Sequence, residues 1–408
     1  MITALNTVWV IFAATLVFFM EGGFALLEAG LVQAKNTISI LMKVIADVTV
    51  GALVFGLVGF SLMYGHSRVG IVGWSGFFFH GAIAAVPHLP APVLWFFELA
   101  FAVAAISIVS GAVSERMRYS AYLVYVVIGI LAYSISAHWV WNPDGWLHRL
   151  GMIDFAGSAV VHSFGGFSAL AAATLVGPRI GRFHLNPVKF RPSNLPLAFG
   201  GTFILWFGWF GFNAGSTLSA FSPLIGTIIV NTMLAGAIGG FSAIMFVRLF
   251  NGTYDPTMAI NGVLAGLVAI TAGCASVGPA AALIIGALAG ILVALATSLI
   301  ERMQVDDPVG AVPVHAFGGA FGTIAVGLFA SHGGLFFGGG LHLLEVQALG
   351  TVVISIWGFG VTALALGAMR RLKVLRVSSI EEAEGLDWRL HGHRAYHTGQ
   401  SPLSAAED

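Results

Sequence analysis

The two residues best placed to do chemistry in this sequence are histidines in nearly identical surroundings. His162 lies in VVHSFGG and His315 lies in PVHAFGG, 153 residues later, and each motif is part of a hydrophobic run. Two imidazoles that share a hydrogen bond fix each other's tautomer, because one ring donates where the other accepts. Such a pair could relay a proton or hydrogen-bond a small polar molecule. The alternative is that each ring satisfies a hydrogen bond in helix packing.

The composition indicates what surrounds these histidines. Of the 408 residues, 58% are hydrophobic and 9% are charged, whereas soluble domains carry about 25% charged residues. The chain is therefore predicted to be an all-α polytopic membrane protein. Its single cysteine, Cys274, excludes a disulfide within the chain.

Hydrophobic runs predict eleven membrane-spanning helices. A span needs roughly 20 apolar residues, and charged residues, prolines and Gly-Asn pairs separate the runs. The predicted spans cover about 4–31, 39–64, 93–113, 119–140, 158–177, 196–212, 222–249, 258–274, 279–300, 311–331 and 345–369.

The basic residues predict the orientation, because Lys and Arg favour cytoplasmic loops. With the N-terminus outside, sixteen of the eighteen Lys and Arg residues, Lys189 among them, fall on the inner side, and Arg68 and Arg149 fall on the outer side. The chain is thus predicted to lie in the cytoplasmic membrane, with the tail from Arg370 in the cytoplasm.

The two histidine motifs lie in the fifth and tenth predicted spans and therefore cross the membrane in opposite directions. This arrangement is typical of an inverted repeat of five plus five helices, with a site near the midplane where the halves meet. We predict a membrane domain at 1–369, with halves at about 1–177 and 196–331 and an added eleventh helix, followed by a tail at 370–408. The glycines beside each histidine would let the helices approach closely.

Aromatic residues and a carboxylate gather at the predicted outer ends of the spans. Phe101 lies in the third span, Trp141 ends the fourth, and Ser216 follows the sixth. Rings with one acceptor can bind a small cation, although a lone interfacial Trp usually contacts lipid headgroups. Asp154 precedes His162 in DFAGSAVVH; it is expected to cap the fifth helix and could also attract a cation.

Four further acidic residues, Glu21, Glu28, Asp47 and Glu98, lie in or beside apolar spans. None of them belongs to a repeated motif. We expect these carboxyl groups to make interhelical hydrogen bonds or subunit contacts rather than to act on a ligand.

Several long motifs closely resemble the Amt branch of the Amt/Mep/Rh ammonium transporter family. They extend over essentially the whole chain: GFALLEAGLVQAKN, GAVSERMRYSA, DFAGSAVVH, GWFGFNAGS, NGVLAGLVAIT, DDPVGAVPVHAFGG and EGLDWRLHGHRAY. The resemblance implies transport of ammonium or ammonia rather than enzymatic catalysis, and no cofactor. One departure is Gly310, because many members carry an acidic residue there, before the second histidine.

The resemblance also implies roles for residues near the outer face. Trp141 and Ser216 look like the external site that recruits ammonium, with Phe101 at its floor and Asp154 as the nearby acidic residue. Phe101 over Phe212 resembles the stacked aromatic gate of the family's pore.

Further into the pore, His162 and His315 resemble the family's twin histidines. Trp209 matches a tryptophan beside the gate, and Thr271 matches a threonine near the pore. Family members are homotrimers with one pore per subunit, and many bacterial members bind a trimeric PII signalling protein through the tail. No nucleic acid partner is implied.

The resemblance thus favours electrogenic ammonium uptake, in which ammonium is recruited outside, loses a proton and passes as ammonia. One alternative is a membrane-embedded ammonium sensor that signals through the tail. A weaker alternative is a metal-dependent hydrolase that uses His162, His315 and Asp154 as ligands, since the sequence lacks His-Glu-x-x-His spacing.

Overall fold

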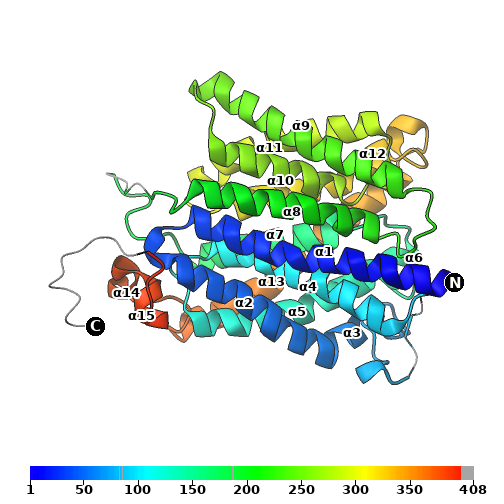
Figure 1. Cartoon of the computed structure of the whole chain (residues 1–408), viewed down its shortest axis with the longest axis horizontal. Coiled ribbons are helices and arrows are strands. Elements are labelled where there is room, and N and C mark those ends of the chain that lie inside the picture. Colours follow the sequence, from blue (N-terminus) through cyan, green and yellow to red (C-terminus); the bar gives the residue numbers. More distant parts are fainter. Residues whose placement is uncertain (82, 85, 186–187, 189, 397–408) are drawn as a thin grey trace.

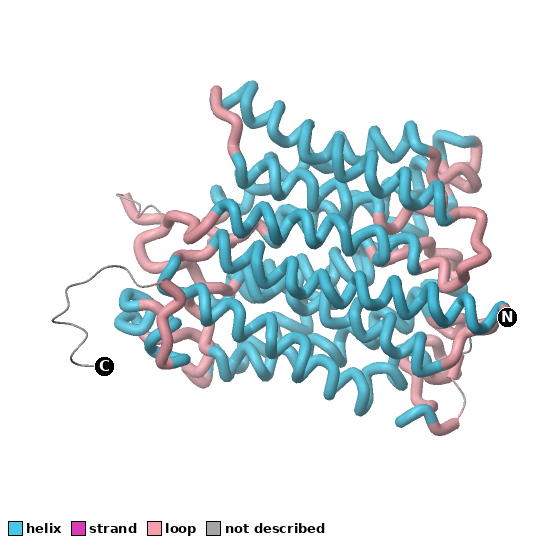
Figure 2. Tube along the Cα trace, in the orientation of Figure 1, coloured by secondary structure: helices cyan, strands magenta, loops and turns pink. Residues whose placement is uncertain are grey.

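The computed structural model describes residues 1–81, 83–84, 86–185, 188 and 190–396. Helices run side by side along the long axis of the molecule, and the loops gather at its two ends (Figures 1 and 2). The N-terminus lies at one end, which we call the N-terminal face, and α14 and α15 lie at the other, which we call the tail face. Lys189 and tail residues 397–408, which entered the predictions above, lie outside the described residues.

The first half of the bundle ends with a helix that carries the first histidine motif. Its helices are α1 (Ile2–Leu31), α2 (Thr37–Val54), α3 (Phe60–Tyr64), α4 (Ala91–Ala112), α5 (Tyr119–Trp141), α6 (Trp146–Arg149) and α7 (Phe164–Val176). A π-helical turn at Phe55–Gly59 joins α2 to α3, and another at Ser158–Ser163 leads into α7.

The second half ends in the same way, with a π-helical turn at Val312–Phe317 that leads into α12. Its helices are α8 (Leu195–Gly215), α9 (Ile225–Asn251), α10 (Pro256–Ile270), α11 (Pro279–Arg302) and α12 (Gly318–Phe329), and they are followed by α13 (His342–Arg371), α14 (Ser379–Glu384) and α15 (Leu386–His391). Proline stands in the first turn of α4, α8, α10 and α11, where its missing N–H would have no intrahelical partner.

The predicted all-helical membrane fold with eleven spans is confirmed. Ten helical segments of the described chain are long and apolar enough to cross a membrane, and the shorter apolar helix α10 completes the set. One predicted boundary is wrong, because the span placed at 258–274 ends as a helix at Ile270. The carbonyl groups of Thr271 and Ala272 instead accept the N–H groups of Ala156 and Phe155, so tertiary hydrogen bonds end a helix that hydropathy would continue.

The repeated glycines mark the place where the two halves touch. The turn that contains His315 packs on Gly166, and the turn that contains His162 packs on Gly319. A Cβ atom on Gly319 would lie 2.5 Å from the carbonyl oxygen of Ser158, and one on Gly166 would overlap the backbone of the opposite turn. The contact is therefore reciprocal, which gives the duplicated Gly-Gly sequence a structural reason.

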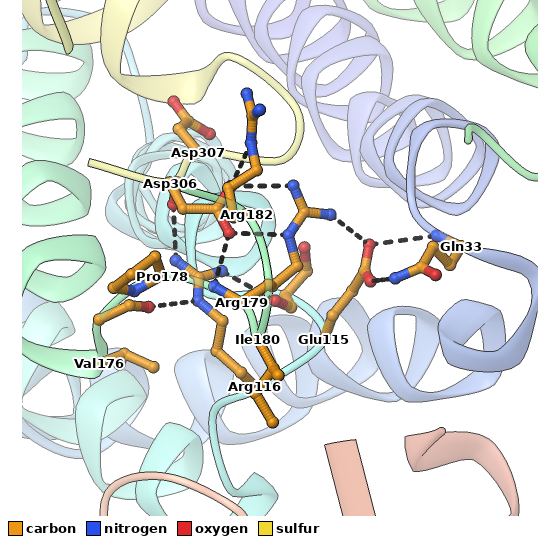
Figure 3. A network of polar contacts seen from close by, with 12 residues as sticks. Gln33, Glu115, Arg116, Val176, Pro178, Arg179, Ile180, Arg182, Asp306 and Asp307 are labelled. Carbon is orange, nitrogen blue, oxygen red and sulfur yellow. Dashed lines mark hydrogen bonds and ion pairs between the residues drawn. The ribbon is translucent and has the colours of Figure 1, made fainter. Parts of the chain in front are cut away.

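Ion pairs join the two halves at the tail face (Figure 3). Arg179, after α7, donates to Asp306 from Nε at 2.8 Å and to Glu115 from Nη1 at 2.9 Å. Gln33 donates its backbone N–H to Glu115 at 3.1 Å. Burial opposes ionisation of Asp306, but the hydrogen bonds from Arg179 and the charge of Arg116 outweigh it and lower the pKa of Asp306 to about 2. The pairs thus form a buried ionic link between the halves.

The tail is held against the same loops. Arg376 donates to the carboxylate of Glu382 at 2.7 Å, and the other oxygen of Glu382 accepts the N–H of Ile180 at 2.7 Å. Asp387, in α15, accepts the N–H of Ser39 at 2.8 Å. A change in the tail would therefore reach the tail-face ends of α2 and α7.

Candidate functional site

A small cavity lies near the N-terminal face, where α4, α5 and α8 approach one another. Phe101, Trp141 and Ser216 line it, and its volume is about 130 Å³. We call this cavity the aromatic cup; its other lining residues are Tyr64, Phe97, Glu98, Phe155 and Leu218. The structure thus brings together the three residues that the sequence predicted to form an outer site.

Stacked rings lead from the floor of the aromatic cup to the first histidine. The rings of Phe101 and Phe212 are stacked with their centroids 4.0 Å apart, and Phe212 is stacked on His162 at 5.5 Å. Trp209 lies beside them, with its ring 5.2 Å from that of His162. Phe101 and Phe212 are buried, so these two rings close the floor of the cup.

The two histidines meet at the centre of the bundle. Their Nδ1 atoms are 3.2 Å apart, within hydrogen-bond distance, and the residues are 2% and 4% exposed. One Nδ1 donates and the other accepts, so one Nε2 must be an acceptor and the other a donor. The Nε2 of His162 has no hydrogen-bond partner among the described residues, which leaves it free to interact with a small molecule.

A π-helical turn holds each histidine, a feature that hydropathy did not predict. Such a turn contains one more residue than an α-helical turn and frequently occurs at functional sites. Asp154 stabilises the first turn: its Oδ1 accepts the N–H of Gly157 at 3.2 Å, and its Oδ2 accepts those of Ala159 and Val160 at 3.0 and 2.8 Å. Its carbonyl oxygen accepts the indole N–H of Trp141 at 2.7 Å. Asp154 therefore caps the turn and positions a ring of the cup, while its carboxylate is not among the groups that line the cup.

Asp307 is the counterpart of Asp154 in the second half, and the sequence analysis missed it. Each aspartate stands eight residues before its histidine and three before a glycine. Asp307 accepts the N–H of Gly310 at 3.1 Å and that of Val312 at 2.7 Å. Gly310, where the sequence analysis noted a departure from the resemblance, has a φ of +81° and so needs the freedom of glycine. Equal spacing from the two histidines was the signal that could have revealed this pair.

Thr271 lies at the point where α10 ends, and it holds the ring next to His162. The indole N–H of Trp209 donates to Oγ1 of Thr271 at 2.9 Å. The threonine hydroxyl donates in turn to the carbonyl of Leu267 at 2.7 Å. Both predicted pore residues are therefore near the histidine pair, Trp209 in contact with it and Thr271 behind Trp209.

A second, smaller cavity of about 20 Å³ lies on the other side of the histidine pair, and we call it the tail-side cavity. Its lining includes His315, Asn261 on α10, and Phe24 and Glu28 on α1. The ring of Phe24 is 6.5 Å from that of His315. The stacked rings and the histidines therefore lie between two cavities.

The other acidic residues in the spans make interhelical hydrogen bonds, as the sequence predicted. Ser107 lies 2.9 Å from a carboxylate oxygen of Glu21 and 3.1 Å from one of Asp47, and Glu28 accepts from Ser110 at 2.7 Å. Glu98 also does so, but it lines the aromatic cup as well, which the sequence analysis did not anticipate.

In the described part of the chain, the histidines and carboxylates near the site are not grouped as metal ligands. Among the residues that the structure describes, no three His, Cys, Asp or Glu side chains form a group able to hold a metal ion. The carboxylate that could complete such a group with the two histidines, Asp154, already accepts backbone N–H groups.

Comparison with known proteins identifies the family of this chain. The model of the Ammonium Transporter Family matches residues 8–396. The chain is 45% identical over 400 residues to a putative ammonium transporter of Synechocystis sp., a match that covers 95% of this chain and 88% of that protein. It is 43% identical over 414 residues to ammonium transporter Amt2 of Archaeoglobus fulgidus, covering 95% and 87% of the two chains. A solved structure described as a sensor Amt protein superposes with a TM-score of 0.90 at 41% identity, covering 95% of this chain and 98% of that one.

Each match extends over nearly the whole chain, and that of the family model includes both histidine motifs and the described part of the tail. The relatives are named as ammonium transporters, so the family is one of transporters and not of enzymes. The family predicted from the sequence motifs is confirmed: the chain belongs to the Ammonium Transporter Family.

Proposed function

We propose that this chain moves ammonium across the cytoplasmic membrane by binding the ion in the aromatic cup, removing a proton, and passing ammonia beside the histidine pair. The observation that carries the proposal is the series of close-packed rings between two cavities. It runs from Phe101 through Phe212 to His162 and His315, with centroid distances of 4.0, 5.5 and 5.2 Å. Such a path suits a small neutral molecule.

The energetics favour separation of the proton from the nitrogen. Transfer of an intact ion from water to apolar surroundings costs of order 20 kcal/mol in the idealised Born limit. The faces of Trp141 and Phe101 can each contribute about 0.5–2 kcal/mol through cation–π interaction. This is enough to recruit an ion at the cup but not to carry it past the buried ring of Phe212. Neutral ammonia avoids most of the cost.

The histidine pair offers a separate route for the proton. When a proton binds the free Nε2 of one ring, the Nδ1 proton of that ring can cross to the other ring, which releases its own Nε2 proton. One proton then moves while ammonia passes as a neutral molecule, so the net process carries charge. Potassium has no proton to give up and cannot use either route.

The orientation and assembly are also part of the proposal. Basic residues of the tail face, among them Lys35, Arg116, Arg118, Arg179 and Arg182, support a cytoplasmic location of that face. We assign residues 1–369 to transport and 370–408 to a regulatory tail. The family resemblance supports a homotrimer with one pore per subunit and a PII-type signalling protein at the tail face.

A second candidate function is an ammonium sensor that signals through the tail. It is favoured by the 41% identity with a sensor Amt protein. The contacts of Arg376 and Glu382 with the loop after α7 also offer a physical connection between the bundle and the tail. The complete ring series favours transport, because a sensor needs binding alone.

The test is a rapid ammonium jump on proteoliposomes, with the transient current recorded for the parent chain and for His162→Leu. We expect a saturable current in the parent, no current on a potassium jump, and at least a tenfold smaller ammonium current in the variant, since general acid–base groups typically contribute about 10²–10⁴-fold. His138→Asn is the matched control, because His138 is also buried but lies on α5 and bonds the carbonyl of Met63 through Nδ1 at 2.8 Å. The amide nitrogen of Asn is attached to Cγ, as Nδ1 is, and can keep that bond.

Two outcomes would contradict the proposal in different ways. An unchanged current in a folded His162→Leu protein would exclude a role of the pair in moving the proton. No current in the parent, together with saturable ammonium binding that alters protease cleavage of the tail, would favour the sensor.

A further inference from the structure

The aromatic cup contains a carboxyl group beside its rings. Glu98 lies on α4 three residues before Phe101, so the two side chains leave neighbouring positions on one face of the helix. Glu98 is 3% exposed and lines the cup together with Tyr64, Trp141 and Ser216. An acidic residue therefore forms part of the wall of the cup.

One oxygen of this carboxyl group is unused. The hydroxyl of Tyr64 donates to Oε1 of Glu98 at 2.7 Å, whereas Oε2 is buried and accepts no hydrogen bond from any described residue. The carboxylate of Asp154, the other acid nearby, accepts three backbone N–H groups of the turn that follows it. Of these two acids, Glu98 is the one with an oxygen free to bind a ligand.

The other polar groups of the cup cannot take a proton from a bound cation as readily. The indole N–H of Trp141 is a donor and is already bonded to the carbonyl of Asp154 at 2.7 Å. The hydroxyl of Ser216 donates to the carbonyl of Phe212 at 2.8 Å, which leaves its oxygen as a weakly basic acceptor. Every N–H of ammonium is a donor, so the ion needs acceptors, and a carboxylate is the most basic acceptor that lines the cup.

We propose that Oε2 of Glu98 is the acceptor that binds the recruited ammonium ion and takes its proton. In this step an N–H bond of ammonium breaks and an O–H bond forms at Oε2, giving ammonia and a neutral carboxylic acid. Ammonia then passes the rings of Phe101 and Phe212, and the acid gives up its proton to the separate proton route of the histidine pair, which restores the carboxylate. The inference rests on the proposed transport function and names the proton acceptor of its first step.

Glu21 provides a matched control for this assignment. It is likewise a buried glutamate in a span, it accepts one hydrogen bond, from Ser107 at 2.9 Å, and its other oxygen has no partner among the described residues. Glu21 does not line the aromatic cup. A comparison of the two residues thus separates the effect of a free carboxylate in the cup from that of a free carboxylate elsewhere in the bundle.

The experiment measures ammonium-jump currents in proteoliposomes that contain the parent, Glu98→Gln or Glu21→Gln. The amide in Glu98→Gln can still accept the hydroxyl of Tyr64, but it cannot accept a proton from ammonium. We expect the current at subsaturating ammonium to fall at least tenfold in Glu98→Gln, the lower range for loss of a general base, and less than threefold in Glu21→Gln. A parent-like current in folded Glu98→Gln, or equal losses in both variants, would overturn the assignment.

A spectroscopic measurement on the parent keeps the test decisive if Glu98→Gln does not fold. The infrared difference spectrum on addition of ammonium should contain the C=O band of a newly protonated carboxylic acid, and this band should shift in Glu98→Asp. A spectrum without that band would overturn the inference while leaving the transport current of the parent intact. Absence of a current in the parent would instead contradict the proposed function.

Discussion

The two histidine turns have the same construction but different neighbours. In each, an aspartate eight residues before the histidine accepts backbone N–H groups. A glycine three residues after that aspartate has a positive φ, and the π-helical turn that contains the histidine comes next. Asp154 and Gly157 do this in the first half, and Asp307 and Gly310 do it in the second. The shared construction brings the two rings to one hydrogen bond.

The neighbours of the two turns differ in kind. The first turn faces aromatic groups: the carbonyl of Asp154 holds the indole of Trp141, and His162 lies against Trp209 and Phe212. The second turn begins six residues after Asp306, which is tied to a buried arginine at the tail face. One end of the repeat thus borders the aromatic cup and the other an ionic contact between halves. The repeat supplies the geometry of the histidines, and the flanking residues supply the chemistry of each end.

The largest effect is expected where the ionic contact of the second half is removed. Arg179→Met removes the ion pairs that Arg179 makes with the buried carboxylates of Asp306 and Glu115. Loss of one partner of a buried pair typically costs about 3–5 kcal/mol, so the free energy of unfolding in mixed micelles should fall by about that amount. Arg389→Met is the control, because Arg389 pairs with the exposed Glu384 away from this network, and such surface pairs contribute little to stability.

The stability difference between the parent and Arg179→Met should depend on pH in a defined direction. Because the folded protein lowers the pKa of Asp306 to about 2, its contribution is present above the unfolded pKa of about 4 and is lost as the pH falls toward 2. The stability difference between the parent and Arg179→Met should therefore narrow below about pH 4. A difference that stays constant to pH 2, or equal losses in the two arginine variants, would contradict an ionic anchor at Asp306.

A smaller effect is expected when each turn loses its aspartate. Asp154→Ala removes the acceptor of three buried N–H groups and Asp307→Ala that of two. At about 1 kcal/mol for each unsatisfied donor, the lower end of the usual range, we expect losses of about 3 and 2 kcal/mol respectively in the same unfolding measurement. Asp255→Ala, which removes an ordinary cap at the half-buried start of α10, should cost about 1 kcal/mol. A loss at Asp307 no larger than that at Asp255 would show that the second turn does not depend on its aspartate.

The sequence predicted most of the fold and much of the site, because both depend on signals that a linear pattern preserves. Apolar length predicts spans whatever their neighbours, and the duplicated motif predicted that His162 and His315 belong together. The family resemblance then assigned the rings of the cup and the gate. These predictions required the identity of residues and their spacing but no knowledge of tertiary contacts.

The features that the sequence did not predict depend on contacts between distant segments. A π-helical turn has no composition of its own, and α10 ends at Ile270 because the loop before His162 takes over its hydrogen bonds. Asp307 was hidden in the pair Asp306-Asp307, whose members have different partners. Glu98 resembled the other acidic residues of the spans; its position three residues before Phe101 was the signal that distinguished it.

The smallest effect on transport is expected when the glycine that follows each aspartate, Gly157 or Gly310, is replaced by Ala. Each has a positive φ, +107° at Gly157 and +81° at Gly310, so Ala at either position should cost about 1–2 kcal/mol of backbone energy. The effects of the two substitutions on neighbouring side chains should differ. A Cβ on Gly157 would lie 2.7 Å from Cγ2 of Val161 and 3.2 Å from the indole of Trp141, whereas one on Gly310 would meet the flexible amide of Asn261.

Gly157→Ala should therefore displace a ring of the aromatic cup and raise the ammonium concentration that gives half-maximal current by about twofold to fivefold, the equivalent of about 0.5–1 kcal/mol. Gly310→Ala should lose similar stability, yet its half-maximal concentration should stay within about twofold of the parent, because Asn261 can rotate away and does not line the cup. Equal shifts of the half-maximal ammonium concentration in the two variants would mean that the different neighbours of the two turns do not affect ammonium affinity. In that case ammonium affinity would depend on the histidine pair, which both turns hold alike, rather than on the cup that the first turn alone supports.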